Sequence, residues 1–441
     1  MSALTQLSLQ LPAQPAKRGA PKANAITSPN MLWDAAAACA YVYGDGNRLY
    51  RSKDLLRWDK VELDMPLTLT QPGVVLLPKE EPFQPVPEYR CYTVEGNSIR
   101  LIVSSRAEGP YLPRGTVLQV YPGDEAAAAC PQPFADPVSR EHYLVYGKDS
   151  AIYVLHLNPR NGMAYETGQG VCLARRPSWA KAISFPSLAY YAETGYYYLT
   201  VTYGNETDGN IRVGRSKSIT GPYVDAGGRV LTDVEDFDAR VGTMLAAGYR
   251  LDDHDGWAAP MNGKLLQAGE LGWMLALTAK NSEGRVFQIR RVIWTDDGWP
   301  VVSPECYGGE TWQPAKAADL PGRYEIITFV PRLPQAMTEF VKMELLTPAV
   351  QGVSSTRNDW AYKIAADSQG RVELGGSHRG SWAWKNDRIL EIRYPNFTQT
   401  LYVLPAWDWE LGEGTMVLTG LDSKGQAVWA KRRDLPPRRR P

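Results

Sequence analysis

Four short stretches of the chain place a small polar or acidic side chain next to a proline where an apolar strand is expected to begin. They are ITSPN (26–30), FADPV (134–138), ISFPS (183–187) and AAPMN (258–262). Proline is tolerated at a first strand position because the sheet does not need its missing N–H. The stretches therefore identify Ser28, Asp136, Ser184 and Asn262 as candidate site residues at strand starts.

The chemistry open to these side chains is limited. Neither Ser28 nor Ser184 has an evident histidine partner in the sequence, and an unactivated hydroxyl is a poor proton donor or acceptor near neutral pH. Asp136 is the one carboxylate of the set, and it fits a ligand contact as well as a structural acceptor for N–H groups at a strand start. These residue types favour ligand binding over proton transfer.

The composition argues against several classes of protein. The chain has 441 residues and equal numbers of basic and acidic side chains, 48 each, so neither nucleic acid nor an anionic membrane surface is expected as a partner. Five cysteines without a CxxC pair predict reduced thiols in a cytoplasmic protein rather than a structural zinc site. No stretch is long and apolar enough to span a membrane, and residues 1–25 lack the apolar core of a signal peptide. We predict no metal and no cofactor.

Strand-like alternation of apolar and polar residues recurs along most of the chain, and helical periodicity is scarce. Five units share one order, with an alternating strand, a short polar turn, an aromatic residue and a second short strand. Their turns fall near residues 53, 105, 159, 218 and 296. A unit of about four strands that repeats five times indicates an all-β, five-bladed β-propeller. Periodic hairpins in a sandwich are the alternative.

The pattern changes near residue 315, where a stretch rich in Pro, Ala and Gly precedes a second all-β region. We expect a flexible leader over 1–25, the propeller over 26–315, a small β-sandwich or barrel over 320–434 and a solvated basic tail over 435–441.

The innermost strands of a propeller begin at a central channel, where residues from several blades meet and a ligand can bind. We therefore expect Ser28, Asp136 and Ser184 to surround one cavity, although they are far apart in the sequence. The start of the second blade is less evident, and FQPVP (83–87) is its candidate.

Several of these segments together resemble glycoside hydrolase family 43, and within it the arabinan endo-1,5-α-L-arabinosidases. The most specific are GRSKSITGPY (214–223) and DGWPVVSPE (297–305), and RSKDLLRW (51–58), DPVSREHYLVYG (136–147) and YYYLTVTYG (196–204) agree. The resemblance covers about residues 26–312, and GSWAWKNDRILEIRY (380–394) resembles the β-domain that follows some arabinanase propellers. It implies a five-bladed propeller and hydrolysis with inversion, in which one carboxylate activates water, a second protonates the leaving oxygen and a third tunes the acid.

The chain departs from the family pattern at the positions that carry this chemistry. By the resemblance, Ser28 matches the base, Ser184 matches the acid and Asp136 matches the tuning carboxylate. Many arabinanases hold a cation in the channel through a histidine; Thr278 matches that histidine and Asn262 matches another, so both are candidate substrate-binding residues. Removing either general catalyst typically costs ~10²–10⁴-fold in rate. Standard hydrolysis is therefore expected to be weak or absent.

Three readings stay open. In the first, the protein binds oligosaccharides of α-L-arabinofuranosyl or related furanoside units without cleaving them. In the second, it is an active O-glycosidase with relocated residues, for which Glu206 in GNETDGN (204–210) is the candidate, although ordinary turn acids also fit this loop. The third is an interaction scaffold. The acidic loop RLDDHDGW (250–257) looks like a metal site, but consecutive residues rarely face one ion, which favours a solvated loop.

Overall fold

The computed structural model describes most of the chain between residues 26 and 433. The described ranges are 26–79, 86–177, 179–180, 182–235, 240–251, 256–311, 314–332, 335, 337–346, 369–375, 378–385 and 388–433. The predicted leader, the predicted tail and the acidic residues 252–255 lie outside these ranges.

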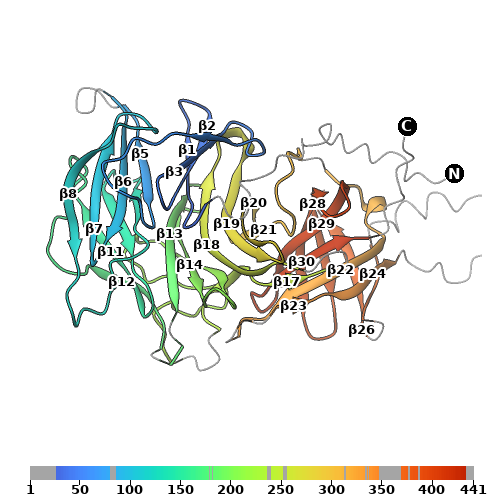
Figure 1. The fold of residues 1–441 in the computed structure, drawn as a ribbon. Helices are drawn as coiled ribbons and strands as arrows, with labels where there is room; N and C mark the ends of the chain where they lie inside the picture. The colour runs from blue at the N-terminus through green and yellow to red at the C-terminus, as the bar shows by residue number, and fades with distance from the viewer. Residues whose placement is uncertain are drawn as a thin grey trace, which may run out of the picture.

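Five four-stranded antiparallel sheets follow one another along the chain and form the blades of a propeller (Figure 1). The blades are numbered I to V in chain order. Their strands are β1 (Asn30–Asp34), β2 (Cys39–Gly44), β3 (Arg48–Ser52) and β4 (Asp59–Val61) in blade I; β5 (Gly73–Leu77), β6 (Glu88–Glu95), β7 (Ser98–Ser104) and β8 (Leu112–Gln119) in blade II; β9 (Gln132–Ala135), β10 (His142–Tyr146), β11 (Ala151–Leu157) and β12 (Val171–Arg175) in blade III; β13 (Ile183–Tyr191), β14 (Tyr196–Tyr203), β15 (Asn210–Ser216) and β16 (Thr243–Ala246) in blade IV; β18 (Ala258–Gln267), β19 (Trp273–Asn281), β20 (Gly284–Trp294) and β21 (Pro300–Val302) in blade V. The five-bladed, all-β prediction is confirmed.

The first strand of each blade lies nearest the propeller axis. β1 contacts β5, β5 contacts β9, β9 contacts β13, β13 contacts β18, and β18 contacts β1 again. The five inner strands thus close a ring, which is the arrangement that defines a propeller. Their starts lie on one face of the ring, called the channel face below.

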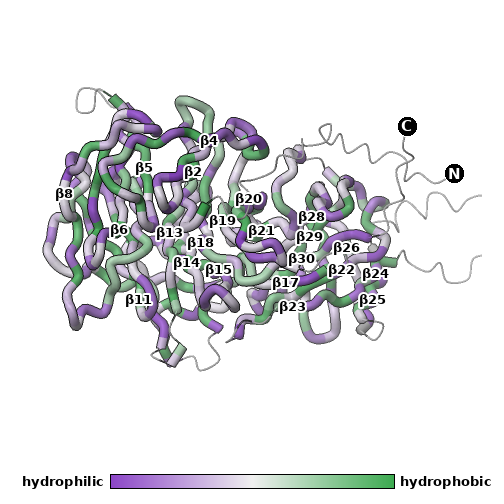
Figure 2. The backbone as a smooth tube through the Cα atoms, in the orientation of Figure 1, coloured by the Kyte–Doolittle hydropathy of each residue, from purple (hydrophilic) through white to green (hydrophobic). Residues whose placement is uncertain are grey.

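The inner and middle strands are buried because neighbouring blades cover both of their faces. In β14, the run YYYLTVTY combines β-branched and aromatic residues that favour a pleated strand, and Tyr198, Leu199 and Val201 are fully buried. Figure 2 shows the hydrophobic residues recurring along the strands of both domains. The cores between blades hold the channel face rigid.

The second domain is a closed eight-stranded barrel. Its strands are β22 (Gly322–Phe329), β24 (Val341–Leu346), β25 (Gln369–Leu374), β26 (His378–Lys385), β27 (Ile389–Arg393), β28 (Thr398–Asp408), β29 (Glu413–Asp422) and β30 (Ala427–Arg432). β30 pairs with β22 and closes the barrel. Trp382 and Tyr324 are buried in its core. Two 3₁₀ turns complete the helical structure of the described residues, η2 (Gly269–Leu271) in blade V and η3 (Ala317–Asp319) before the barrel.

The barrel packs directly on the propeller. β17 (Tyr249–Arg250), which follows blade IV, pairs in parallel with β23 (Thr338–Glu339) of the second domain. One buried cluster includes Tyr249 from the propeller and Trp429 from the barrel, whose rings meet edge to face with centroids 5.3 Å apart. The junction is therefore a packed hydrophobic interface.

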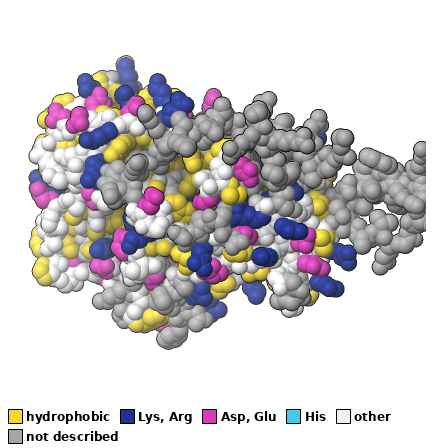
Figure 3. Space-filling model, turned by 45° about the vertical axis from the view of Figure 1, so that its right-hand side comes forward, with side chains coloured by type: hydrophobic (Ala, Val, Ile, Leu, Met, Phe, Trp, Pro, Cys, Tyr) yellow, Lys and Arg dark blue, Asp and Glu magenta, His cyan; other side chains and the backbone are white. Residues whose placement is uncertain are grey.

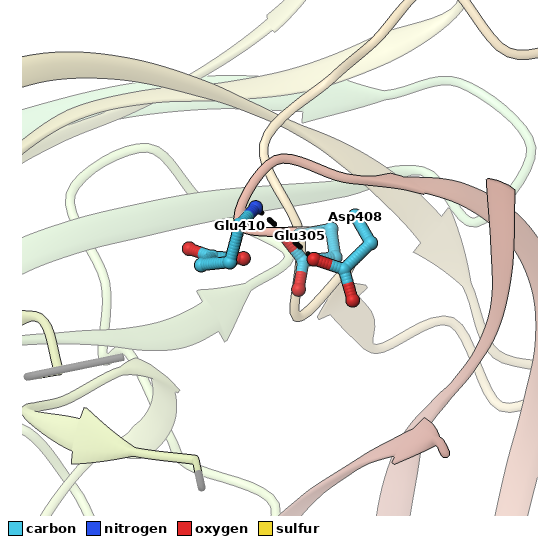
Figure 4. A group of neighbouring side chains, drawn as sticks. All are labelled: Glu305, Asp408 and Glu410. Carbon is cyan, nitrogen blue, oxygen red and sulfur yellow. Dashed lines mark hydrogen bonds between the residues drawn. The ribbon is translucent and has the colours of Figure 1, made fainter. Parts of the chain in front are cut away.

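A buried ionic cluster lies beside this interface. Lys431 of β30 is fully buried and its Nζ lies 2.7 Å from Glu305, 2.7 Å from Asp408 and 3.3 Å from Glu410. The three carboxylates come together from blade V and from the end of β28 (Figure 4). Burial raises the pKa of Glu305 to about 8, and the neighbouring carboxylates add to this effect, whereas Lys431 opposes it. The Lys431 ammonium is the cation that holds this cluster together.

The outer surface carries mixed charge. On the face shown in Figure 3, basic and acidic side chains are interspersed with hydrophobic ones over the described residues. All five cysteines are free, and Cys39, Cys91 and Cys130 are buried. Within the described ranges, no helix combines the length and the apolar character that a membrane crossing requires.

Candidate functional site

The same backbone feature, a residue with positive φ followed by proline, occurs at or near the first residue of each inner strand. In every blade a residue with a positive φ, between 44° and 49°, stands directly before a proline. These pairs are Ser28–Pro29, Gln71–Pro72, Cys130–Pro131, Phe185–Pro186 and Ala259–Pro260. A positive φ is uncommon for residues other than glycine, and such strained positions gather at functional sites. Because this unusual conformation recurs in all five blades, we take the channel face as the candidate functional site.

The start of blade I carries a carboxylate that the sequence pattern did not reveal. Ser28 Oγ donates a hydrogen bond of 2.9 Å to Asp45 Oδ2. Asp45 Oδ1 in turn accepts the N–H of Gln71 at 2.6 Å, and the Asp45 N–H donates to Thr27 O at 3.0 Å. Asp45 is half-buried and belongs to the turn between β2 and β3. It therefore joins the starts of blades I and II.

The start of blade III is Cys130. Its N–H donates to the side-chain oxygen of Gln71 at 2.9 Å, and the Phe185 backbone hydrogen-bonds its thiol. Burial raises the pKa of Cys130 to about 12, so the group is a neutral thiol at physiological pH. It connects the starts of blades II, III and IV.

Ser184 is the second residue of β13, directly before Phe185, and is buried, with 6% of its surface exposed. It pairs across the hairpin with Thr202 of β14. The hydroxyl of Thr202 accepts the N–H of Asn262 at 2.9 Å, and Asn262 Nδ2 donates to Pro29 O at 2.6 Å. Asn262 thus bridges the neighbourhoods of Ser184 and Ser28. Together with Asp45, Gln71 and Cys130, these contacts form a hydrogen-bonded belt through all five strand starts.

Thr278 and Glu206 are brought to the same rim of blade V, and an arginine binds both. Arg285 Nη1 donates to Thr278 Oγ1 at 3.2 Å and to Ala259 O at 2.9 Å. Its Nη2 lies 2.7 Å from Glu206 Oε2. Glu206 is 66% exposed in its side chain and is held by this guanidinium rather than directed at Ser28 or Ser184.

These residues do not fit the channel cation that the family resemblance implies. The hydroxyl at the position of the expected histidine, Thr278 Oγ1, already faces the positive charge of Arg285. Asn262 donates its amide nitrogen to a backbone carbonyl and offers only one neutral amide oxygen in place of the expected imidazole. A second cation beside a guanidinium is unfavourable, so no step of the chemistry is assigned to a metal here.

A lysine side chain lies deeper in the ring of inner strands. Lys264 of β18 donates from Nζ to Asn30 Oδ1 at 3.2 Å, and Asn30 Nδ2 donates to Gln132 Oε1 at 2.8 Å. Desolvation lowers the pKa of Lys264 to about 8. Lys264, Asn30 and Gln132 therefore form a polar layer below the belt. Of these three side chains only Lys264 is ionisable, and it is basic.

Asp136 does not lie with the other candidates, and its expected position was wrong. It follows the end of β9 rather than a strand start, and it accepts hydrogen bonds from Ser139 Oγ at 2.5 Å and from the Tyr197 hydroxyl at 3.0 Å. Tyr197 pairs with Tyr190, at the end of the β13–β14 hairpin opposite to Ser184. The buried carboxylate closes the β9–β10 turn and anchors blade III to blade IV. The third strand start is Cys130, and the second is Gln71 rather than the stretch at 83–87, of which residues 83–85 lie outside the described part of the chain.

The comparisons with known proteins agree with this architecture. The sequence profile described as glycosyl hydrolases family 43 matches residues 84–300, and one described as a C-terminal lipocalin-like domain of this family matches residues 304–430. The chain is 25% identical over 370 residues to the extracellular endo-α-(1→5)-L-arabinanase 2 of Bacillus subtilis, with 76% of this chain and 73% of the relative covered.

Solved structures show the same fold. The endo-1,5-α-L-arabinanase of Thermotoga petrophila superposes with a TM-score of 0.78 at 20% identity, covering 95% of this chain and 100% of that one. The α-L-arabinanase of Cellvibrio cellulosa, complexed with arabinohexaose, has a TM-score of 0.52 at 19% identity, covering 64% of this chain and 96% of that one. The propeller with its attached barrel is thus the two-domain architecture of a glycoside hydrolase. The chain belongs to glycoside hydrolase family 43, among arabinanase-like proteins.

Proposed function

We propose that the channel face binds arabinan-type oligosaccharides, built of α-L-arabinofuranosyl or related furanoside units, and that hydrolysis by the standard inverting route is weak or absent. The family membership supports the ligand class, and the names of the relatives describe arabinanases. One observation carries the second part. The three strand starts that the family chemistry would use present Ser28, a neutral Cys130 thiol and Ser184.

Inversion needs two carboxylates about 6.5–9.5 Å apart, one to activate water and one to protonate the leaving oxygen. Neither serine can take these roles at neutral pH without an activating partner. The belt offers hydroxyl, amide and backbone groups, which recognise sugar hydroxyls by hydrogen bonds. Trp179 lies five residues before Ser184, on the segment that leads from β12 into β13, and is 52% exposed. An exposed aromatic ring beside polar groups suits the apolar face of a sugar.

A binding experiment tests this proposal. Linear arabino-oligosaccharides are titrated into the full chain by calorimetry while reducing ends are counted in the same samples. We expect saturable binding without product, and a loss of affinity of about tenfold in Trp179→Ala. Tyr165→Ala is the matched control, because Tyr165 is equally exposed but follows β11, at the opposite end of the strands. Absence of binding in the wild type contradicts the proposal.

A second candidate function has one observation in its favour. Asp45 places a carboxylate within hydrogen-bond reach of Ser28, the position of the base. An active O-glycosidase with relocated residues would use Asp45 through Ser28 rather than Glu206, which is bound to Arg285. Product release that disappears in Asp45→Asn but persists in Glu206→Gln would support this function over binding alone.

The cytoplasmic location stays a prediction. The name of the Bacillus subtilis relative describes that protein as extracellular. Fractionation of the cells that produce this chain, with detection of the protein in each fraction, decides between the two locations.

A further inference from the structure

A cavity of about 250 Å³ lies at the junction of the propeller and the barrel. Its walls come from β20 of blade V, from the segment after β21, from the turn of β3–β4 in blade I and from the β28–β29 hairpin of the barrel. Its size is near the lower end of small-molecule pockets, about 300–1,000 Å³. The cavity is therefore suited to a compact ligand rather than to a polymer segment of many units.

The cavity adjoins the channel face but is separate from the belt. Val286 lines it and directly follows Arg285, which contacts Ala259 at the start of blade V. Trp257 lines it and stands two residues before Ala259.

Two tryptophans line the cavity, one from each domain. Trp257 belongs to the propeller and Trp409 to the barrel, and both are partly exposed. Trp409 Nε1 donates to Cys306 O at 3.0 Å, which fixes the ring and satisfies its polar atom. Phe287 adds a buried aromatic ring. The cavity thus offers flat apolar surfaces of the kind that stack on one face of a ring.

The polar groups of the cavity select the charge of the ligand. Glu305 and Glu410 line it, and the Lys431 ammonium behind them is already shared among Glu305, Asp408 and Glu410, so an anion finds no unshared cation here. A cation is disfavoured because the Lys431 ammonium already lies 2.7 and 3.3 Å from these carboxylates. A wholly apolar ligand would remove water from both carboxylates without replacing its hydrogen bonds.

Gln288 contributes a buried side-chain amide to the wall of the cavity. It lines the cavity and is only 2% exposed. Its oxygen accepts two N–H groups of Arg290, at 3.2 and 2.9 Å, while Nε2 has no hydrogen-bond partner among the described residues. A buried donor without a partner is costly. A sugar hydroxyl can accept as well as donate hydrogen bonds, whereas an ammonium group can only donate.

We propose that this junction cavity, lined by Trp257, Trp409, Gln288, Glu305 and Glu410, is a second saccharide site that binds one neutral sugar residue. A sugar ring combines an apolar face for the indoles with hydroxyls that can donate to an acceptor oxygen of Glu305 or Glu410. The site extends ligand recognition from the propeller to the barrel, and it gives the second domain a direct part in binding. It stands independently of the proposed channel-face function.

Two tryptophan variants and two probes test the site. Methyl α-L-arabinofuranoside and arabinotriose are titrated into the full chain, with calorimetry for the stoichiometry and tryptophan fluorescence for the position. We expect millimolar binding of the monosaccharide probe that falls at least about tenfold in Trp409→Ala and in Trp257→Ala. Trp409→Phe keeps an aromatic wall and should retain affinity within about threefold. Trp179→Ala on the channel face is the matched control and should leave this component unchanged.

The outcomes separate the cavity from the channel face. Loss of one component in Trp409→Ala and Trp257→Ala, with melting temperatures close to the wild type, supports the junction site. Binding that persists unchanged in both variants overturns it. If Trp409→Ala fails to fold, Trp257→Ala and Trp409→Phe still test the site. Trp257→Ala removes the wall residue of the propeller and should weaken binding, whereas Trp409→Phe keeps an aromatic ring on the barrel side and should not. Binding that depends on Trp409 but not on Trp179 leaves the junction site standing even where the channel face binds nothing.

Discussion

Ser28 and Asp45 form a hydroxyl–carboxylate pair at the start of the first blade, with Oγ 2.9 Å from Oδ2. The pair lies at the position that the family resemblance assigns to the catalytic base. A carboxylate therefore lies within hydrogen-bond reach of residue 28, although residue 28 itself is a serine. Asp45 will therefore affect the pKa of any carboxylate that is introduced at residue 28.

Restoring the base alone is expected to give little. In Ser28→Asp the new carboxylate would lie beside Asp45, and two carboxylates at such a distance do not both ionise, so one pKa rises. Ser28→Asp combined with Asp45→Asn removes this conflict. In a background that carries Ser184→Glu and Cys130→Asp, we expect the combination to hydrolyse arabinan about tenfold faster than the variant with Asp45 intact. Equal rates in the two backgrounds would show that Asp45 does not affect the new base.

Glu206 is expected to be a surface partner of Arg285 and not a catalyst. Glu206→Gln should change the free energy of unfolding by less than about 1 kcal/mol, because the carboxylate is largely exposed. Arg285→Met should cost more, about 1–3 kcal/mol, since Ala259 O and Thr278 Oγ1 lose their donor. Denaturant titrations measure both, and a larger effect from Glu206→Gln than from Arg285→Met would be incompatible with these contacts.

Asp136 is expected to act on stability and not on ligand binding. Asp136→Asn weakens the acceptor of the Tyr197 and Ser139 hydroxyls in a buried turn, so unfolding should become easier by about 1–3 kcal/mol. The affinity for arabino-oligosaccharides should stay within about twofold of the wild type. A selective loss of affinity with unchanged stability would return Asp136 to the binding site.

The ionic cluster at the junction predicts a pH dependence. The pKa of Glu305 is raised to about 8 in the folded protein, above the unfolded value of about 4.3. Between these values the folded state keeps a proton that the unfolded state has lost, so stability falls as the pH rises from about 5 to 8, by up to about 1.4 kcal/mol per pH unit. The pKa of Lys431 is raised by the same carboxylates; its contribution is lost only above its unfolded value of about 10.4 and adds no slope here.

Glu305→Gln provides the check. It imitates the protonated acid and should flatten the dependence of the unfolding free energy between pH 5 and 8, while Glu339→Gln, an exposed carboxylate of β23 paired with Arg250, should leave the slope as it is. Urea titrations at four pH values in this interval measure it. A wild-type stability that rises with pH in this window would contradict the assignment.

The fold followed from the sequence because blade repeats leave local signals. Alternating strands, turns and aromatic residues recur in each blade, and their number gave five blades. The strand starts were harder, because Asp-Pro at 136–137 imitates a start although it lies in a turn. The distance to the next Tyr-Gly could have separated them. Ser28 precedes Gly44 by 16 residues and Cys130 precedes Gly147 by 17, whereas Asp136 precedes it by only 11.

The polar belt could not be read from the sequence, because its contacts join residues that no motif relates. Asp45 reaches Ser28 and Gln71 only after blades I and II pack together, and Arg285 reaches Glu206 from the adjacent blade. The orientation of the Gln288 amide likewise depends on Arg290, which donates two hydrogen bonds to its oxygen. Ser28, Ser184 and Asn262 could be named from the prolines that mark strand starts. Thr278 was named only through the family resemblance, and the structure pairs it with Met261.

The most direct test of the account measures the release of reducing ends from linear arabinan by the wild type, by Ser28→Asp/Cys130→Asp/Ser184→Glu with Asp45→Asn, and by the single variants. We expect turnover by the wild type to lie at least ~10⁴-fold below the ordinary range of about 1–10³ s⁻¹, although the oligosaccharide binds. We expect a clear gain only when the acid and the base are restored together, since each step of inversion needs its own carboxylate. Wild-type turnover within the ordinary range would contradict the account and would assign the catalysis to relocated residues, with Asp45 as the first to replace.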